Sequence, residues 1–115
     1  MSNHYVFSCG ATPLAGFSIV PTAEGEWSEF GVFWANPEGN GLGKKALKAA
    51  QEMARARGTK LFALSKKERM GLFTRNNFQF HGPLQDALSK LPDLPEELHH
   101  YDFTSDRRPL LFTYE

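Results

Sequence analysis

Residues 29–58 read EFGVFWANPEGNGLGKKALKAAQEMARARG, and this stretch decides the fold of the chain. Phe30 to Ala35 is an almost continuous apolar run, which is typical of a strand buried on both faces. A glycine-rich turn, Asn36 to Gly43, leads into an amphipathic helix that Gly58 is suited to end. A strand that feeds a helix through such a turn leaves free backbone N–H groups at the helix start. The stretch therefore predicts a site for a phosphate group.

The composition is that of an ordinary globular protein. The chain has 115 residues, enough for one core, so a single domain over residues 1–115 is expected. The 13 basic and 13 acidic side chains cancel, which argues against nucleic acid or a membrane surface as a partner. The sequence has no apolar run of membrane-spanning length and no N-terminal signal pattern. A lone cysteine, Cys9, cannot form an internal disulfide and suits a reducing compartment, so a cytoplasmic location is expected.

The flanking sequence predicts a mixed sheet. Towards the N-terminus, apolar runs separated by short turns predict antiparallel strands over His4–Cys9, Leu14–Val20 and Trp27–Ala35. The buried run Lys60–Leu64 follows the helix, and a strand–helix–strand unit of this length makes its two strands parallel. The remaining expected elements are a helix over Lys67–Asn76, a strand over Phe78–Phe80, helical turns around Leu88, Leu91 and Leu98, and a strand over Pro109–Tyr114. The predicted fold class is α/β, with antiparallel hairpins followed by a parallel crossover.

The helix after the turn has two faces. Small and apolar residues recur at helical spacing and predict the face turned toward the sheet. These residues are Ala46, Ala50, Met53 and Ala54. Charged and amide residues are expected on the outer face, and they are Lys45, Lys48, Gln51, Glu52 and Arg55.

Three alternating glycines, Gly39, Gly41 and Gly43, close the turn. Glycine lacks the Cβ that keeps a ligand away from the backbone, but glycines in such a turn also serve simply to make a sharp corner. Both interpretations stay open on the glycines alone. Cationic residues in the opening turns of both helices oppose the helix dipoles unless an anion binds there. They are Lys44, Lys45, Lys48, Lys66, Lys67 and Arg69, and they favour an anion site at the edge where both helices begin.

Two other phosphate-binding motifs do not fit the spacing. A P-loop requires Gly-Lys-Ser/Thr, whereas Gly43-Lys44 is followed by Lys45. A dinucleotide-binding fold requires a further glycine and an acidic residue after the second strand, and Ala46 and Ser65 stand in roughly those places.

As an ordered set, residues 29–78 resemble the Gcn5-related N-acetyltransferase superfamily. The family pattern is an apolar strand, a turn ending in Gly-x-Gly, a helix ending in Ala-x-x-x-Gly, a short strand, and a helix ending in aromatic-x-x-x-Gly-Phe. The corresponding segments are Phe30–Ala35, 36–43, Ala54–Gly58, Leu61–Leu64 and Phe73–Phe78. The tail from Leu91-Pro92 to Arg107-Arg108 is similar to amino-acid N-acetyltransferases of the N-acetylglutamate synthase kind. The resemblance implies a chain that begins at the family's second strand, without the first strand and the two helices that wall the acceptor pocket.

The resemblance implies acetyl-coenzyme A (acetyl-CoA) as co-substrate. The backbone of Phe33, Trp34 and Ala35 would pair with the pantetheine arm like an added strand. The amides of the loop and helix start would hold the pyrophosphate, and the candidates are Gly39, Asn40, Gly41, Leu42, Gly43, Lys44 and Lys45. Phe73 and Asn76, on the second helix, complete the cofactor-binding candidates. Glu38 departs from the family pattern, because it stands where an Arg or Gln usually opens the loop.

The implied chemistry is acetyl transfer to the amine of a small molecule, with an amino acid such as glutamate as one candidate acceptor. Glu29 stands where the family often places a base, although it could equally be a solvent-facing strand start. Phe73 replaces the family's acid tyrosine, so Ser65, Thr74 or water would protonate the thiolate. An acceptor carboxylate would bind a guanidinium, for which Arg75, Arg107 and Arg108 are the candidates.

The alternative is a non-catalytic acetyl-CoA-binding module that senses the coenzyme or regulates a protein partner. No metal site is expected, because His99-His100 lacks the spacing of a helical metal pair. The absent N-terminal elements would leave a sheet edge exposed, so a homodimer that covers this edge is expected.

Overall fold

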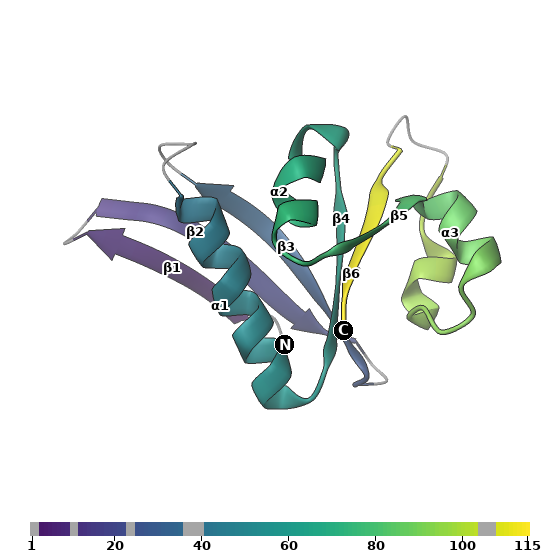
Figure 1. The fold of residues 1–115 in the computed structure, drawn as a ribbon. Helices are drawn as coiled ribbons and strands as arrows, with labels where there is room; N and C mark the ends of the chain where they lie inside the picture. Colours follow the sequence, from purple (N-terminus) through teal and green to yellow (C-terminus); the bar gives the residue numbers. More distant parts are fainter. Residues whose placement is uncertain (1–2, 10–11, 23–24, 36–40, 104–107) are drawn as a thin grey trace.

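The computed structural model describes residues 3–9, 12–22, 25–35, 41–103 and 108–115. Within these ranges six strands form one sheet, with helices on both sides (Figure 1). The elements in chain order are β1 (Asn3–Cys9), β2 (Thr12–Pro21), β3 (Trp27–Ala35), α1 (Leu42–Arg57), β4 (Lys60–Ser65), the 3-10 helix η1 (Lys67–Arg69), α2 (Met70–Arg75), β5 (Gln79–Pro83), α3 (Leu84–Lys90), the 3-10 helix η2 (Glu96–His100) and β6 (Leu110–Tyr114).

The sheet is mixed, as the sequence predicts. Its strand order is β1-β2-β3-β4-β6-β5, so β6 inserts between β4 and β5. The pairs β1–β2 and β2–β3 are antiparallel, and β3 and β4, which α1 connects, are parallel. β6 is antiparallel to both of its neighbours. The predicted hairpins and parallel crossover are therefore confirmed.

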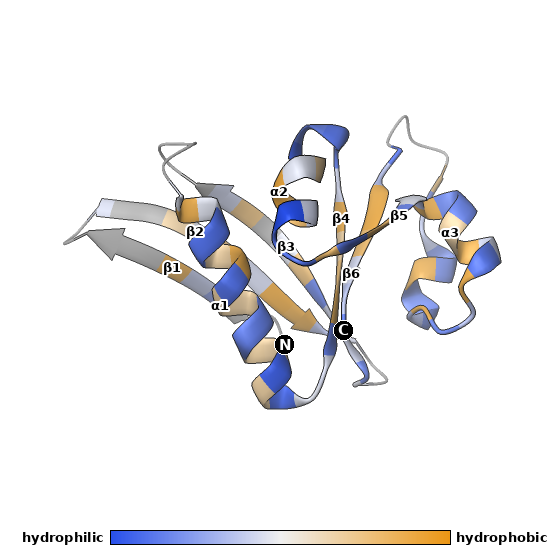
Figure 2. Ribbon diagram, viewed as in Figure 1, coloured by the Kyte–Doolittle hydropathy of each residue, from blue (hydrophilic) through white to orange (hydrophobic). Residues whose placement is uncertain are grey.

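Helix α1 ends where the sequence predicts and starts slightly earlier. Gly58 adopts a left-handed conformation, with φ of 69°, and caps the helix. The helix begins at Leu42, because the left-handed Gly41 (φ 85°) is its N-cap. Its outer face is hydrophilic and its inner face apolar (Figure 2).

The prediction that Gln51 faces outward is wrong. Gln51 is buried together with Leu47, Ala50 and Ala54, which share one stripe of α1. Its amide nitrogen donates a hydrogen bond of 2.5 Å to the carbonyl of Asn76 at the end of α2. Burial of the polar side chain is possible because this bond satisfies it.

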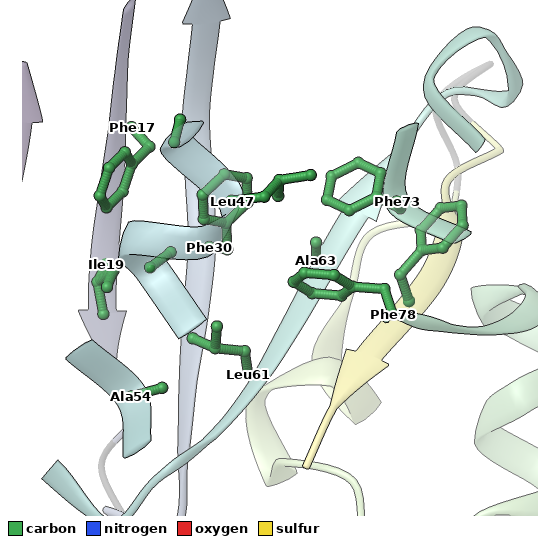
Figure 3. Packing of buried hydrophobic residues seen from close by; sticks show 12 residues of the cluster. Phe17, Ile19, Phe30, Leu47, Ala54, Leu61, Ala63, Phe73 and Phe78 are labelled. Carbon is green, nitrogen blue, oxygen red and sulfur yellow. The ribbon is translucent and has the colours of Figure 1, made fainter. Parts of the chain in front are cut away.

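The main core lies between one face of the sheet and the helices α1 and α2. Figure 3 shows its side chains converging from both layers, among them Phe17, Phe30, Leu47, Leu61 and Phe73. A second cluster lies on the other face under α3 and η2. On β4 and β6 its members alternate in sequence with those of the first cluster, as Phe62 does with Leu61 and Leu111 with Phe112, because successive strand residues point to opposite faces.

The second helix is shorter than the sequence predicts. The expected single helix over Lys67–Asn76 is a 3-10 turn, η1, followed by α2, and the backbone changes at Arg69 (φ −101°, ψ 2°). The predicted left-handed end is confirmed at Asn77, whose φ is 71°. The 3-10 turn matters for the site, because it decides where the Arg69 side chain points.

Candidate functional site

The parallel strands β3 and β4 separate part of the way along their length. They pair only over Trp27–Glu29 and Lys60–Phe62. Beyond this point β3 continues beside β2 as far as Ala35, and β4 continues beside β6 as far as Ser65. In Figure 1, β3 leans away from β4 toward the edge of the sheet where α1 begins. We call the space between the two diverging strands the β3–β4 opening, and Glu29 lies at its narrow end.

An irregularity in β3 lies within this opening. Gly16 of β2 pairs with Trp34, but Ser18 pairs with Gly31, so β3 has one extra residue between these pairs. Phe33 lies within this bulge, and its carbonyl accepts a hydrogen bond of 2.9 Å from Nη1 of Arg69. The Trp34 indole lies over Gly16, whose added Cβ would meet its Nε1 at 2.6 Å. Phe33 and Trp34 lie on the part of β3 that is not paired with β4, and we call the side of this part that faces β4 the β3 edge. Their pairing with pantetheine stays a prediction.

The start of α1 lies against the end of β3. A Cβ on Gly43 would lie 3.2 Å from the Phe33 ring and 3.3 Å from Leu72 of α2. Gly43 therefore allows close packing of helix and strand, whereas a Cβ on Gly41 would meet nothing within 4 Å. The first turn of α1 has no acidic residue, and Lys44 and Lys45 are exposed. Free N–H groups and cations at this helix start could bind a phosphate.

We expect Gly43→Ala to destabilise the protein by about 1–2 kcal/mol, because the added methyl group would separate α1 from Phe33 and Leu72. Gly71→Ala in α2 is the matched control. Its Cβ would meet only the end of the flexible Arg75 side chain, at 3.0 Å, so this variant should be neutral or slightly more stable. Urea unfolding of both variants measures the difference. Equal effects would contradict the packing role of Gly43.

Glu29 is half-buried, on the face of the sheet that α3 and η2 cover. It shares this face with Trp27, two residues earlier, whose Nε1 donates a hydrogen bond of 3.0 Å to the Asp93 carbonyl. Burial raises the pKa of the Glu29 carboxyl above its ordinary value, and the negative charge of Glu97 on η2 raises it further. A carboxylate with a raised pKa is better suited to accept a proton near neutral pH.

The raised pKa of Glu29 predicts a pH-dependent stability. Between the ordinary and the raised pKa, the folded protein holds a proton that the unfolded chain has lost, so stability falls as pH rises through this window. Glu29→Gln removes this effect. We expect the variant to be more stable than the wild type at neutral pH, with the difference vanishing below the ordinary pKa of glutamate. Urea unfolding across this pH range tests the expectation, which a less stable variant at neutral pH would contradict.

The candidate acid residues lie in different settings. Ser65 is the last residue of β4, at the wide end of the opening. The Thr74 hydroxyl is exposed on α2 and donates to the Met70 carbonyl of the preceding turn at 3.0 Å.

The two cofactor-binding candidates on the second helix are buried. Phe73 is 2% exposed and stacks on Phe112, so it belongs to the core. Asn76 is also buried, and its amide donates to the Leu72 carbonyl at 2.7 Å.

The candidate cations for an acceptor carboxylate are not brought together. Arg75 is exposed on α2, on the side of the sheet opposite Glu29, and its guanidinium lies beside Gly71. Arg108 is exposed just before β6, whose first residue pairs with Ser65. Gly39, Asn40 and Arg107 lie outside the described residues.

The described part of the chain contains no group of three or more His, Cys, Asp and Glu residues placed to hold a metal ion. Among the described residues, no helix is both long and apolar enough to cross a membrane.

Comparison of the sequence with protein-family models and with curated proteins finds no match. Solved structures do match. N-acetylglutamate synthase from Neisseria gonorrhoeae, complexed with coenzyme A and L-arginine, superposes with a TM-score of 0.75 at 21% identity, over 97% of this chain and 24% of that one. The chain thus spans about a quarter of the synthase's length.

Two shorter acetyltransferases match over most of their own length. The Bacillus subtilis acetyltransferase in complex with CoA has a TM-score of 0.71 at 15% identity, covering 99% of this chain and 76% of that one. Tetrahymena Gcn5 has a TM-score of 0.67 at 16% identity, covering 98% and 68%. At these identities the likeness concerns the fold. It confirms the predicted fold class, and the fold of this chain is that of the Gcn5-related N-acetyltransferases.

Proposed function

We propose that the protein transfers the acetyl group of acetyl-CoA to the amine of a small molecule. The observation that carries this proposal is the β3–β4 opening, with Glu29 at its narrow end and the starts of α1 and η1 at its wide end. The fold supports it, because two structures that share the fold contain bound coenzyme A.

The residues at the opening fit the coenzyme. The β3 edge beyond Glu29 is not paired with β4, and an extended chain with amide groups can add to such an edge as a strand does. Pantetheine has two amides. The first turn of α1 offers to the pyrophosphate the backbone N–H groups that precede Lys45, whose own amide donates to the Gly41 carbonyl, together with the side chains of Lys44 and Lys45. We therefore place the pantetheine arm along Phe33–Ala35 and the phosphates at α1.

The reaction would proceed by direct attack of the amine nitrogen on the thioester carbonyl carbon. Glu29 accepts the proton that the ammonium loses, directly or through water. A β3 amide near Phe33 or Trp34 stabilises the oxyanion. The C–S bond then breaks, and the thiolate takes a proton from Ser65, Thr74 or water. The second proton that the amine nitrogen loses when the amide forms restores the group that protonated the thiolate. Ser65 is the better placed of the two hydroxyls, because the Thr74 hydroxyl donates to its own helix.

The acceptor is proposed as a small amine, and glutamate is one member of that class. Glutamate would need Arg107 or Arg108 for its carboxylates, since Arg75 lies across the sheet from Glu29. The charges of Glu29 and Glu97 disfavour an acidic acceptor and favour a neutral or cationic one. A panel of glutamate, other amino acids, diamines and aminoglycosides, read by release of free thiol, tests this preference for neutral or cationic acceptors. Glutamate as the best substrate would contradict the preference.

Calorimetric titration with acetyl-CoA tests the cofactor site. The double variant Lys44→Gln/Lys45→Gln is expected to bind about three- to tenfold more weakly, because it loses two cations at the helix start. Lys90→Gln, in the last turn of α3 under the other face, is the control and should bind normally. Equal affinity of all three proteins would place the phosphates elsewhere. Lack of binding by the wild type would overturn the proposed function.

A non-catalytic acetyl-CoA-binding module is the second candidate. Phe73 carries no proton and is buried in the core, and the Thr74 hydroxyl donates to helix carbonyls. Both observations argue against protonation of the thiolate by these side chains, and neither argues against binding of the coenzyme. Tight binding of acetyl-CoA with no thiol release on any amine of the panel would favour this candidate over the enzyme.

We also propose a cytoplasmic homodimer. Within the described residues β1 pairs only with β2, and Val6 on β1 is 55% exposed. An open strand edge with an exposed apolar side chain is suited to pairing with a second chain. Light scattering that gives a monomer at working concentrations would remove the dimer from the proposal.

A further inference from the structure

Arg69 bridges the β3–β4 opening from one side to the other. It lies four residues after the end of β4, and its Nη1 donates a hydrogen bond of 2.9 Å to the Phe33 carbonyl of β3. Its guanidinium carbon also lies 4.8 Å from the centre of the Phe33 ring. Both contacts hold the guanidinium against the same residue of the β3 edge.

The local backbone directs Arg69 into this position. The amide of Arg69 donates to the Lys66 carbonyl at 3.2 Å and closes the 3-10 turn η1. The neighbouring Lys66 and Lys67 side chains are exposed, whereas Arg69 is half-buried. Within the described part of the chain no carboxylate forms an ion pair with Arg69. Of the three cations at this turn, Arg69 is therefore the one that the fold directs at the backbone of β3.

We propose that Arg69 is a gate for the coenzyme, holding the β3 edge closed until the pantetheine arm displaces it. This inference rests on the proposed function, because it requires a ligand that runs along Phe33–Ala35. The guanidinium satisfies a carbonyl that lies beyond the end of β3–β4 pairing, and so stabilises the free protein. The guanidinium donates to this carbonyl and lies over the Phe33 ring, so a ligand amide that pairs with the carbonyl takes the place of the guanidinium.

A gate has a defined effect on binding. The free protein loses the hydrogen bond and the ring contact of Arg69 when the ligand enters, and this loss lowers the observed affinity. The required motion also slows association. Removing the Arg69 side chain therefore speeds association and tightens binding, whereas removing a cation that attracts phosphate does the opposite.

The test compares Arg69→Ala with Lys67→Ala, which removes the same charge from an exposed neighbour. Stopped-flow and calorimetric titrations use acetyl-CoA and, as a probe without phosphate, S-acetylpantetheine. Relative to Lys67→Ala, Arg69→Ala is expected to bind acetyl-CoA about three- to tenfold more tightly, with a faster association rate. Arg69→Lys keeps the charge but not the planar stacking, and should bind with intermediate affinity. Thermal unfolding without ligand shows that the variants are folded.

Two results overturn the gate in distinguishable ways. If the wild type binds acetyl-CoA but Arg69→Ala binds no better than Lys67→Ala, Arg69 is not a gate and the proposed function stands. If the wild type binds neither probe, the proposed function fails, and the gate fails with it. Tighter binding of both probes by Arg69→Ala supports the gate, because S-acetylpantetheine has no phosphate to attract.

Discussion

Glu29→Gln is expected to lower kcat for acetyl transfer by about 10²- to 10⁴-fold, the usual contribution of a general base. Glutamine cannot accept a proton, yet it keeps the size of the side chain at the narrow end of the β3–β4 opening. Affinity for acetyl-CoA should be unchanged, since the coenzyme is placed along Phe33–Ala35 and at the start of α1. Steady-state kinetics with the best amine of the panel, together with calorimetry, separates the two effects.

Glu97→Gln is the matched control for Glu29. It removes the neighbouring charge that raises the pKa of Glu29 and leaves the base itself in place. The Glu29 pKa therefore falls, and the acid limb of the pH profile of kcat/KM should move to lower pH with activity retained. Full activity of Glu29→Gln would remove Glu29 from the reaction, and water or another group would then have to accept the proton.

Phe73→Ala is expected to destabilise the protein by about 3–5 kcal/mol, the usual cost of deleting a buried aromatic ring. Phe73 is 2% exposed and its ring stacks on Phe112 with centroids 4.8 Å apart. It also meets Phe30 and Phe78 edge-on, so its removal leaves a cavity between α2 and the sheet. Because a domain is stable by only about 5–15 kcal/mol, much of the folding free energy would be lost. Urea unfolding measures the change.

Phe80→Ala is the control for the buried ring. Phe80 also contacts Phe112, at 5.2 Å between centroids, but it is 40% exposed on β5. Truncating it should cost about 1 kcal/mol, because its ring is already partly in water. Similar losses for the two variants would contradict the assignment of Phe73 to the core. Such a result would support the prediction from the sequence that the Phe73 ring lies beside the coenzyme.

The order and type of the elements could be read from local patterns. Gly58 and Asn77 end helical segments with positive φ, as their residue types predict. Gln51 shows where the pattern misleads. It lies on the buried stripe with Leu47, Ala50 and Ala54, but its polar character predicts exposure. Its partner, the Asn76 carbonyl, is 25 residues away in the chain, and local periodicity contains no information about it.

The candidate site likewise combines features that the sequence predicts with features that it does not predict. The sequence predicts the glycine-rich turn, the cations at both helix starts and the candidate base Glu29. It does not separate Arg69 from Lys66 and Lys67, which share its charge and its place before a helix. The 3-10 turn and the bulge in β3 together direct Arg69 to the Phe33 carbonyl, and neither has a signal in residue type alone.

By itself, the sequence determined the strand and the helix within residues 29–58, because strand and helix periodicity, glycine conformation and helix capping act between residues close in the chain. Only the tertiary structure decided where β3 and β4 separate, that Glu97 acts on Glu29, and that Arg69 reaches across to Phe33. These features depend on strand register and on contacts between distant segments, such as Arg69 and Phe33, which lie 36 residues apart.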